Sequence, residues 1–276
     1  MAVEPSTRYQ PAAELWRYRH LLWSLTVREL RVRYKQSLLG ISWAVFVPLS
    51  MMLVFTFVFT QTMRLTNGPA VGMPYALFAY IGLVPWTFFA SGLNASVNSL
   101  VGHQNLVTKV YFPREVLPLA GIGACFVDFL VASSVLVGLI AYFHFTSDWS
   151  FSPSPAVLFV PVILAVQTAL MVGLGMFLAM ANLFYRDVRQ IFSVVIQLWL
   201  FASNVVFPLT PDDSIIGRIV AMNPMIAIIQ AYRDCLVGHQ LPDAGPFAYA
   251  TIVSLVALVA GWACFHRAGY LFAERI

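Results

Sequence analysis

The sequence predicts an all-α integral membrane protein with six transmembrane helices, and two observations carry this prediction. Apolar residues make up 60% of the 276 residues, and Asp, Glu, Lys and Arg make up only 10%, whereas about 25% of a soluble domain is charged. Apolar runs then recur at the length that a helix needs to cross a bilayer. So few charges could not cover a water-soluble surface, and we expect lipid to solvate most of the chain.

Six segments are long enough to cross the hydrocarbon layer, for which roughly 20 apolar residues suffice. The first is Ile41–Met63, which contains no charged residue. The other five predicted spans are Met73–Leu93, Leu117–Phe143, Ala156–Met180, Ile191–Pro208 and Phe247–Phe265. An even number of spans places both ends of the chain on the same side of the membrane.

The basic residues indicate which side that is. Thirteen of the sixteen Lys and Arg fall in the segments 1–39, 94–116, 181–190 and 266–276, and basic loops stay in the cytoplasm. We therefore expect a multi-pass membrane protein with both termini cytoplasmic. Because residues 1–39 hold seven of these cations, a cleavable signal peptide is not expected. One domain, 1–276, would comprise a cytoplasmic segment (1–39), five spans (40–208), an outer segment (209–246), the sixth span (247–265) and a cytoplasmic tail (266–276).

The segment before the first span is amphipathic at helical spacing. Its apolar stripe comprises Trp23, Val27, Leu30 and Tyr34, and the adjacent stripe comprises Ser24, Arg28, Arg31 and Lys35. Glu29 and Arg33 have the spacing of an intrahelical ion pair. We expect a helix that lies in the membrane interface, with its basic side against lipid headgroups or against a partner protein.

The outer segment 209–246 is too short and too polar to span the bilayer twice. Two short re-entrant helices that dip into the outer leaflet would satisfy its backbone, and Asn223-Pro224 marks the turn between them. They would bury Ile215, Ile216, Ile219, Val220, Met225, Ile228 and Ile229.

Several motifs resemble one family, the transmembrane permease subunits of ABC exporters for cell-surface polysaccharides such as O-antigen, capsule and teichoic acid. The matching stretches are Arg28–Trp43, Lys109–Pro118, Asn182–Arg189, Asn223–Met225 and Tyr232-Arg233. They occur in the family's order and cover nearly the whole chain. The resemblance implies a homodimer, with two copies of a separate ATPase that binds ATP and Mg and with a polymer channel between the two permease halves.

Pro113 and Pro118 break the stretch 98–118 into short helical pieces, and the resemblance also implies that segment 98–115 carries a coupling helix. Its candidate contacts to the ATPase are Asn98, Leu100, Leu106, Val107, Lys109, Val110, Arg114 and Glu115. A re-entrant loop packed on its own bundle is the alternative. The interface helix would contribute Arg28, Glu29, Arg31, Arg33, Tyr34 and Lys35, and Arg186-Asp187 matches a pair in the connection between spans four and five.

A polysaccharide channel needs a lining that contacts sugar rings without holding any hydroxyl tightly, and aromatic rings are suited to this. The candidate lining residues are Trp43, Phe46, Phe55, Phe59, Tyr80, Trp86, Phe89, Trp199 and Phe207. For any single ring, helix packing or contact with lipid is the alternative.

Asp128 is the only charged residue within a predicted span. A carboxylate there costs about 2.5 to 3.5 kcal/mol on insertion scales, so it needs a polar environment, either at a functional site or beside hydrogen-bonding neighbours such as serines. Arg233 could meet a phosphate or an acidic sugar, or form an ion pair or helix-end contact. Gly173 and Gly175 indicate close helix packing.

The sequence excludes several functions. Neither of the two lysines ends a P-loop, and the three cysteines have no metal-ligand spacing. We expect no nucleotide or metal bound by this chain and no nucleic-acid partner. Two functions compete with export: an ion-coupled secondary transporter, which needs several intramembrane ionisable groups, and a membrane-embedded transferase acting on lipid-linked sugars, which needs convergent acid-base groups.

Overall fold

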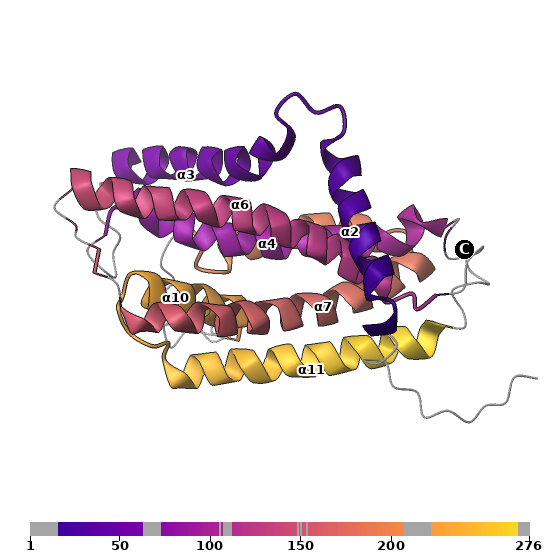
Figure 1. Ribbon diagram of the computed structural model, residues 1–276. Helices are drawn as coiled ribbons and strands as arrows, with labels where there is room; N and C mark the ends of the chain where they lie inside the picture. The colour runs from indigo at the N-terminus through magenta and orange to yellow at the C-terminus, as the bar shows by residue number, and fades with distance from the viewer. Residues whose placement is uncertain are drawn as a thin grey trace, which may run out of the picture.

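The computed structural model describes residues 16–62, 73–104, 106, 112–147, 149, 151–152, 154–206 and 222–269. Within these ranges the chain is helical, without an extended strand (Figure 1). Its α-helices are α2 (Arg19–Tyr34), α3 (Trp43–Thr62), α4 (Tyr75–Gly102), α6 (Val116–Thr146), α7 (Val160–Phe184), α8 (Val188–Phe201), α10 (Pro224–Leu236) and α11 (Ala244–Ala268). The 3-10 turns Gly40–Ser42 and Pro155–Phe159 lead into α3 and α7.

Five helical stretches are long and apolar enough to cross a membrane, and they fall on five of the six predicted spans. They are Gly40–Phe59, Tyr75–Gly102, Val116–Thr146, Pro155–Phe184 and Ala244–Ala268. The shortest has 20 residues, which as a helix rises about 30 Å, the thickness of the hydrocarbon layer.

The fifth predicted span, Ile191–Pro208, is not found as a long helix. Helix α8 has 14 residues, a rise of only about 21 Å, and its C-cap is Ala202. Hydropathy counts apolar residues and does not show where the backbone stops being helical. The last two residues of this predicted span lie outside the described ranges.

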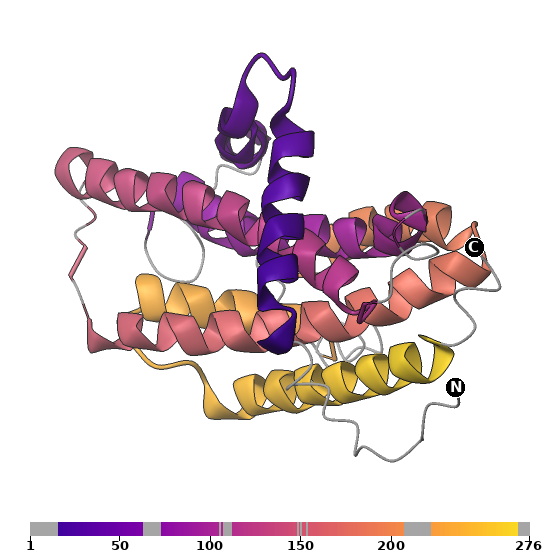
Figure 2. The ribbon, with the colours of Figure 1, turned by 45° about the vertical axis from the view of Figure 1, so that its right-hand side comes forward.

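Helices α4, α6, α7 and α11 lie side by side, and α2 crosses them at a steep angle (Figures 1 and 2), near one end of the bundle in Figure 1. We call this the α2 end of the bundle. The beginning of α6 and the end of α11 meet there, because the Arg114 side chain donates a hydrogen bond to the carbonyl of Gly269. The beginnings of α4, α7 and α11 lie at the opposite end. Helix α3 is inclined to the other long helices and is seen almost end-on in Figure 2.

Helix α4 is the centre of the bundle and packs against α3, α6, α7 and α10. Two buried polar side chains of α7 hold α4 in place against α7. Gln167 donates a hydrogen bond to the carbonyl of Pro85 at 2.8 Å, and Asn182 donates one to the carbonyl of Val97 at 2.8 Å. Buried donors that reach a backbone carbonyl set the register of two apolar helices, because a shifted register would leave both groups unsatisfied.

Glycines permit the closest helix contacts. A Cβ on Gly173 would overlap the α11 backbone at Ala257 and Leu258, and a Cβ on Gly261 would overlap the carbonyl of Gly173. A Cβ on Gly175 would lie 2.7 Å from the Ser96 hydroxyl of α4. The predicted packing role of Gly173 and Gly175 is thus confirmed, and both views show α7 beside α11 (Figures 1 and 2).

The predicted outer segment contains one described helix, α10. Asn223 caps it through a hydrogen bond from the Met225 amide, and Pro224 occupies its first turn. The expected burial of Met225, Ile228 and Ile229 is confirmed, since each is 0% exposed. The other expected helix, with Ile215, Ile216, Ile219 and Val220, lies outside the described residues.

Candidate functional site

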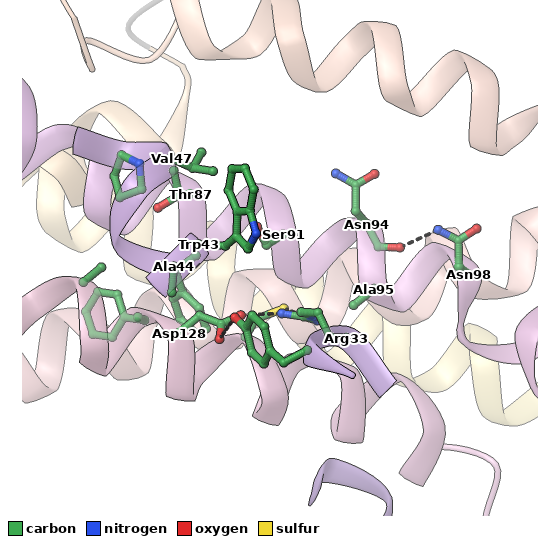
Figure 3. A pocket seen from close by; sticks show the side chains of 16 residues that line it. Arg33, Trp43, Ala44, Val47, Thr87, Ser91, Asn94, Ala95, Asn98 and Asp128 are labelled. Carbon is green, nitrogen blue, oxygen red and sulfur yellow. Dashed lines mark hydrogen bonds and ion pairs between the residues drawn. The ribbon is translucent and has the colours of Figure 1, made fainter. Parts of the chain in front are cut away.

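The only acid within a predicted span pairs with the helix that precedes the first span. An oxygen of Asp128 accepts a hydrogen bond from the Tyr34 hydroxyl at 2.5 Å, and its other oxygen forms an ion pair with Arg33 (Figure 3). Arg33 also donates to the Cys125 thiol at 3.4 Å. The partners of Asp128 are therefore the guanidinium of Arg33 and the phenol of Tyr34, and not the expected serine neighbours.

This pair explains how a carboxylate is tolerated in α6. The side chains of Arg33 and Asp128 are 32% and 18% exposed, so both are largely withdrawn from solvent, and each is compensated by the other. Close packing accompanies the pair, because Gly123 of α6 leaves room for Thr26 of α2. Asp128 is thus a docking point for α2 on α6.

A second contact ties α2 to the end of α4. His103 Nε2 lies 2.9 Å from Glu29 Oε1, and His103 Nδ1 lies 2.9 Å from the carbonyl of Ser99. The predicted pair between Glu29 and Arg33 is wrong, because each of them has a tertiary partner instead. Exposed intrahelical pairs contribute only about 0.3–0.5 kcal/mol, so partners in adjoining helices outweigh them.

The stripe of α2 that packs on the bundle also differs from the predicted one. Leu25 and Thr26 are buried, whereas Trp23 of the predicted apolar stripe is 68% exposed. Trp23 and Val27 line an outer groove together with Arg28, Arg31 and Lys35. The outward side of α2 is therefore both aromatic and basic, as in helices that lie among lipid headgroups.

The Glu29–His103 contact makes part of the stability depend on pH. The hydrogen bond with Glu29 raises the pKa of His103 above its ordinary 6.5, and the hydrogen bond with His103 lowers the pKa of Glu29 below its ordinary 4.5. A histidine with a raised pKa stabilises the fold fully below 6.5, and this contribution is lost as the pH rises through the raised value. The contribution of Glu29 is present above 4.5 and is lost as the pH falls through its lowered value.

We therefore expect His103→Gln to lower the melting temperature more at about pH 6 than at about pH 8.5. A pair of this kind contributes about 1 kcal/mol, which corresponds to roughly 2–4 °C in a chain of this size. The measurement is thermal unfolding of the detergent-solubilised protein, with His20→Gln on the exposed side of α2 as the control. An equal loss at both pH values would contradict the ion pair.

The predicted coupling segment, residues 98–115, is attached to the bundle at both ends. Some of its candidate residues are buried in the bundle and are not accessible to a partner protein. Leu100 is wrong as a docking side chain, because it belongs to α4 and is 0% exposed. Leu106 is half-buried against the bundle. Glu115 is buried and lies 3.2 Å from Nδ1 of His266 in α11. Asn98 lies on α4, while Val107, Lys109 and Val110 lie outside the described residues.

Polar side chains satisfy the backbone where α8 stops. Asn223 donates to the carbonyl of Ala202 at 2.8 Å and to the Ser203 hydroxyl at 2.9 Å, and its own carbonyl accepts from the Trp199 indole at 3.0 Å. The Tyr75 hydroxyl donates to the carbonyl of Val206 at 2.6 Å. In an apolar bundle an unpaired carbonyl is costly, so these side chains replace the missing helical turns.

Arg233 belongs to the same network. It is 0% exposed and donates to the carbonyl of Val205 at 2.9 Å, with its guanidinium 3.7 Å from the centre of the Phe78 ring. Its contacts among the described residues are therefore backbone carbonyls and an aromatic face, and an ion pair stays a prediction, because Asp212 and Asp213 lie outside the described ranges. Arg233 is completely buried within the single chain, and its contact with a phosphate or an acidic sugar stays a prediction.

The predicted channel aromatics divide into two groups. Tyr80, Trp86 and Phe89 are buried within the single chain, and Trp199 packs against Phe89 with ring centres 5.3 Å apart. This placement corresponds to helix packing, the alternative for any single ring.

The remaining rings are more accessible. Trp43 and Phe46 are exposed, and Phe55 and Phe59 are half-buried. Phe207 lies outside the described residues. Arg186 and Asp187 are exposed in the turn between α7 and α8. Which rings line a channel stays a prediction.

Comparison with known proteins identifies the family. The ABC-2 type transporter family matches residues 20–237, which is well over half of the chain. This chain belongs to the ABC-2 type transporter family.

Several curated relatives of this ABC-2 type transporter cover nearly its whole length. The O-antigen export system permease protein RfbA of Myxococcus xanthus is 34% identical over 266 residues, 95% of this chain and 98% of that protein. A protein of the same name from Klebsiella pneumoniae is 29% identical, over 92% of this chain and 94% of its own length. The polysialic acid transport protein KpsM of Escherichia coli is 24% identical, over 88% and 91%.

In this ABC-2 type transporter, the motifs that carried the resemblance make contacts between helices. The contacts are Arg33 and Tyr34 with Asp128, Glu115 with His266, Asn182 with Val97, and Asn223 and Arg233 with the backbone after α8. Sequence reasoning missed the partners His103, His266 and Tyr75, because pairing over such distances along the chain has no local spacing signal.

Proposed function

We propose that this chain is the permease subunit of an ATP-driven exporter that moves lipid-linked cell-surface polysaccharide, O-antigen in the first instance, across the bacterial inner membrane. One observation carries the proposal: the 34% identity to an O-antigen export permease extends over 95% of this chain and 98% of that relative. A likeness over the whole length covers the transport path as well as the fold.

The permease would act as a homodimer with two copies of a separate ATPase, and ATP and Mg would bind to that ATPase. Large apolar side chains of α3 support a dimer or lipid contact on that face, since Leu53, Val54 and Phe57 are at least 60% exposed. The described residues hold no group of three metal-binding side chains. Within the proposal this chain is the transport subunit, and the separate ATPase hydrolyses the ATP.

A sixth crossing through residues 188–206 belongs to the proposal, and the chain path supports it. Asn182, near the end of α7, bonds to Val97 near the α2 end of α4, whereas Val206 accepts from Tyr75 at the opposite end of α4. The chain must therefore pass along α4 between these points. Helix α8 rises about 21 Å, and the five residues that follow add up to about 17 Å when extended, which suffices for about 30 Å of hydrocarbon.

Within the proposal, this path and the five long helices make six crossings, with α2 and the end of α11 on the same side of the membrane. The predicted excess of basic residues in the segments on that side supports a cytoplasmic location for it. Helix α10 would then lie in the outer half of the membrane as a re-entrant helix, with its polar network closed by Asn223 and Arg233.

The experiment that tests the function is reconstitution with and without a co-expressed ATPase subunit. We expect the complex to export lipid-linked glycan on addition of ATP and Mg, and the permease alone neither to export nor to hydrolyse ATP. Export by the permease alone, driven by an ion gradient, would instead indicate a secondary carrier. Transfer of sugar between lipids would indicate a transferase.

The coupling segment supplies a variant for the same assay. Leu106→Asp combined with Val107→Asp is expected to abolish the stimulation of ATP hydrolysis by the permease, because a buried carboxylate disrupts an apolar docking contact at a cost of several kcal/mol. The melting temperature of the permease by itself serves as the folding control. Unchanged hydrolysis and export in this variant would show that the ATPase docks elsewhere.

A further inference from the structure

A cavity of about 550 Å³ lies between α2, α3, α4 and α6. Its lining includes Arg33 and Tyr34 before α3, Trp43 and Val47 at the start of α3, and Asp128 and Phe129 of α6. Figure 3 shows this cavity from close by. Its size falls within the range of sites for small organic ligands. The cavity is distinct from the network at the end of α8, which lies at the opposite end of α4.

One face of α4 gives this cavity its polar character. Thr87, Ser91, Asn94 and Asn98 line it, and their spacing of four, three and four residues places them in one row along the helix. Helix α4 is otherwise the most buried span of the bundle. A row of hydroxyls and amides on such a helix is costly in lipid, and polar groups at membrane depth face cavities and transport paths.

The row still offers hydrogen-bonding capacity. The amide nitrogens of Asn94 and Asn98 donate to the backbone carbonyls of Ala90 and Asn94, at 2.9 and 2.8 Å. Each amide has a second N–H and an acceptor oxygen beyond the bond that it makes. Ser91 and Asn94 are exposed in the single chain, so the row is open to a ligand.

The charge of the lining selects the kind of ligand. Arg33 is matched by Asp128, and burial raises the pKa of Tyr34, which keeps its phenol neutral. Among the residues that the structure describes, no other Lys, Arg, Asp or Glu lines the cavity. A diphosphate group would require uncompensated cations, whereas a neutral sugar requires amides, hydroxyls and an aromatic face such as that of Trp43.

The depth of the cavity suits a sugar close to its membrane anchor. Asn98 lies four residues and Thr87 fifteen residues before the end of α4 at Gly102, which corresponds to about 6 and 22 Å along the helix. The cavity therefore extends from the α2 end to the middle of the bundle.

We propose that this cavity binds an uncharged sugar residue of the exported glycan, held by the polar row of α4 and stacked on Trp43. This rests on the proposed export function and adds a defined binding site to it. The Arg33–Asp128 pair closes the cavity toward α2 and presents polar atoms to the sugar without net charge. The site would engage the glycan before it passes into the channel.

Protection of a cysteine from alkylation tests the site. Ser91→Cys is introduced into a Cys264→Ser background, since Cys264 is the exposed cysteine of the described residues and Cys125 and Cys235 are buried. The permease–ATPase complex in nanodiscs is treated with a small maleimide. A polyprenyl diphosphate that carries a neutral hexose oligosaccharide is expected to slow labelling about tenfold, a difference of about 1.4 kcal/mol.

Two controls identify what is bound. The bare polyprenyl diphosphate is expected to leave the labelling of Ser91→Cys unchanged, and neither lipid should protect Leu255→Cys, which is 52% exposed on α11. Equal protection by the bare carrier would assign the cavity to the diphosphate or the lipid chain and overturn the sugar site. Absence of protection by both would overturn it as well.

Export by variants of the row gives a second measurement. Asn94→Leu combined with Asn98→Leu keeps the side-chain volume and removes the amides, and we expect protection to be lost and export to fall about tenfold with an unchanged melting temperature. Asn94→Gln, which retains an amide, should keep most of the export. If the wild-type complex exports glycan while Ser91→Cys stays unprotected, the sugar site is contradicted and the export function is not. If the wild-type complex exports no glycan, both the sugar site and the proposed function are contradicted.

Discussion

Gly173→Val is expected to prevent the bundle from assembling. The added Cβ would overlap the backbone of Ala257 and Leu258 in α11, and a neighbouring backbone cannot turn away as a side chain can. The two helices would have to separate along their contact, with a loss that we estimate at about 4 kcal/mol, above the usual cost of overpacking. The measurement is the yield of monodisperse protein extracted in mild detergent, which should fall to a small fraction of the wild-type yield.

Gly138→Val is the matched control for this variant. Gly138 lies in α6, and nothing lies within 4 Å of a Cβ built there, so its replacement tests the intrinsic effect of valine in a membrane helix. Its yield should stay close to that of the wild type. Similar yields for the two variants would mean that α7 and α11 are not in backbone contact at Gly173.

Asp128→Asn is expected to release α2 from the bundle. The substitution leaves the Arg33 guanidinium, 32% exposed, without its counter-charge, and removing one partner from a shielded pair costs about 2–3 kcal/mol. The melting temperature should fall by roughly 5–10 °C. Arg33→Gln should destabilise in the same way, while Arg31→Gln on the exposed side of the same helix should not.

A double-variant cycle makes this prediction specific. Arg33→Gln and Asp128→Asn together should cost clearly less than the sum of the two single losses, because the second substitution removes a charge that is already unpaired. Strict additivity would show that the two side chains do not interact. Limited proteolysis of residues 16–35 gives an independent measurement, since an undocked α2 is cleaved faster.

The spans were predictable because a bilayer imposes a length on every apolar helix, and five predicted segments were confirmed at α3, α4, α6, α7 and α11. The end of α8 was missed because hydropathy is averaged along a segment, so that the two polar residues Ser203 and Asn204 do not interrupt an otherwise apolar run. What ends α8 is a set of side chains from distant positions, among them Asn223 and Arg233.

The partners of the charged residues were likewise not predictable from the sequence. A single acid in a span indicates that a partner exists, and this held for Asp128, but its partner is 95 residues away in Arg33. The spacing of Glu29 and Arg33 predicted a local pair that tertiary contacts override. The polar row of α4 could have been recognised from its helical spacing, but only the cavity beside it shows which way it faces.

The side chains that complete α8 also constrain the order in which the chain can be built into the bilayer. During synthesis α8 emerges before Asn223 and Arg233 exist, and the carbonyls of Ala202 and Val205 then have no donors from these side chains. Exposed to lipid, each unpaired carbonyl costs several kcal/mol. If residues 188–206 cross the membrane as proposed, we expect them to settle there only together with α10, so that the two segments leave the translocon as one hairpin.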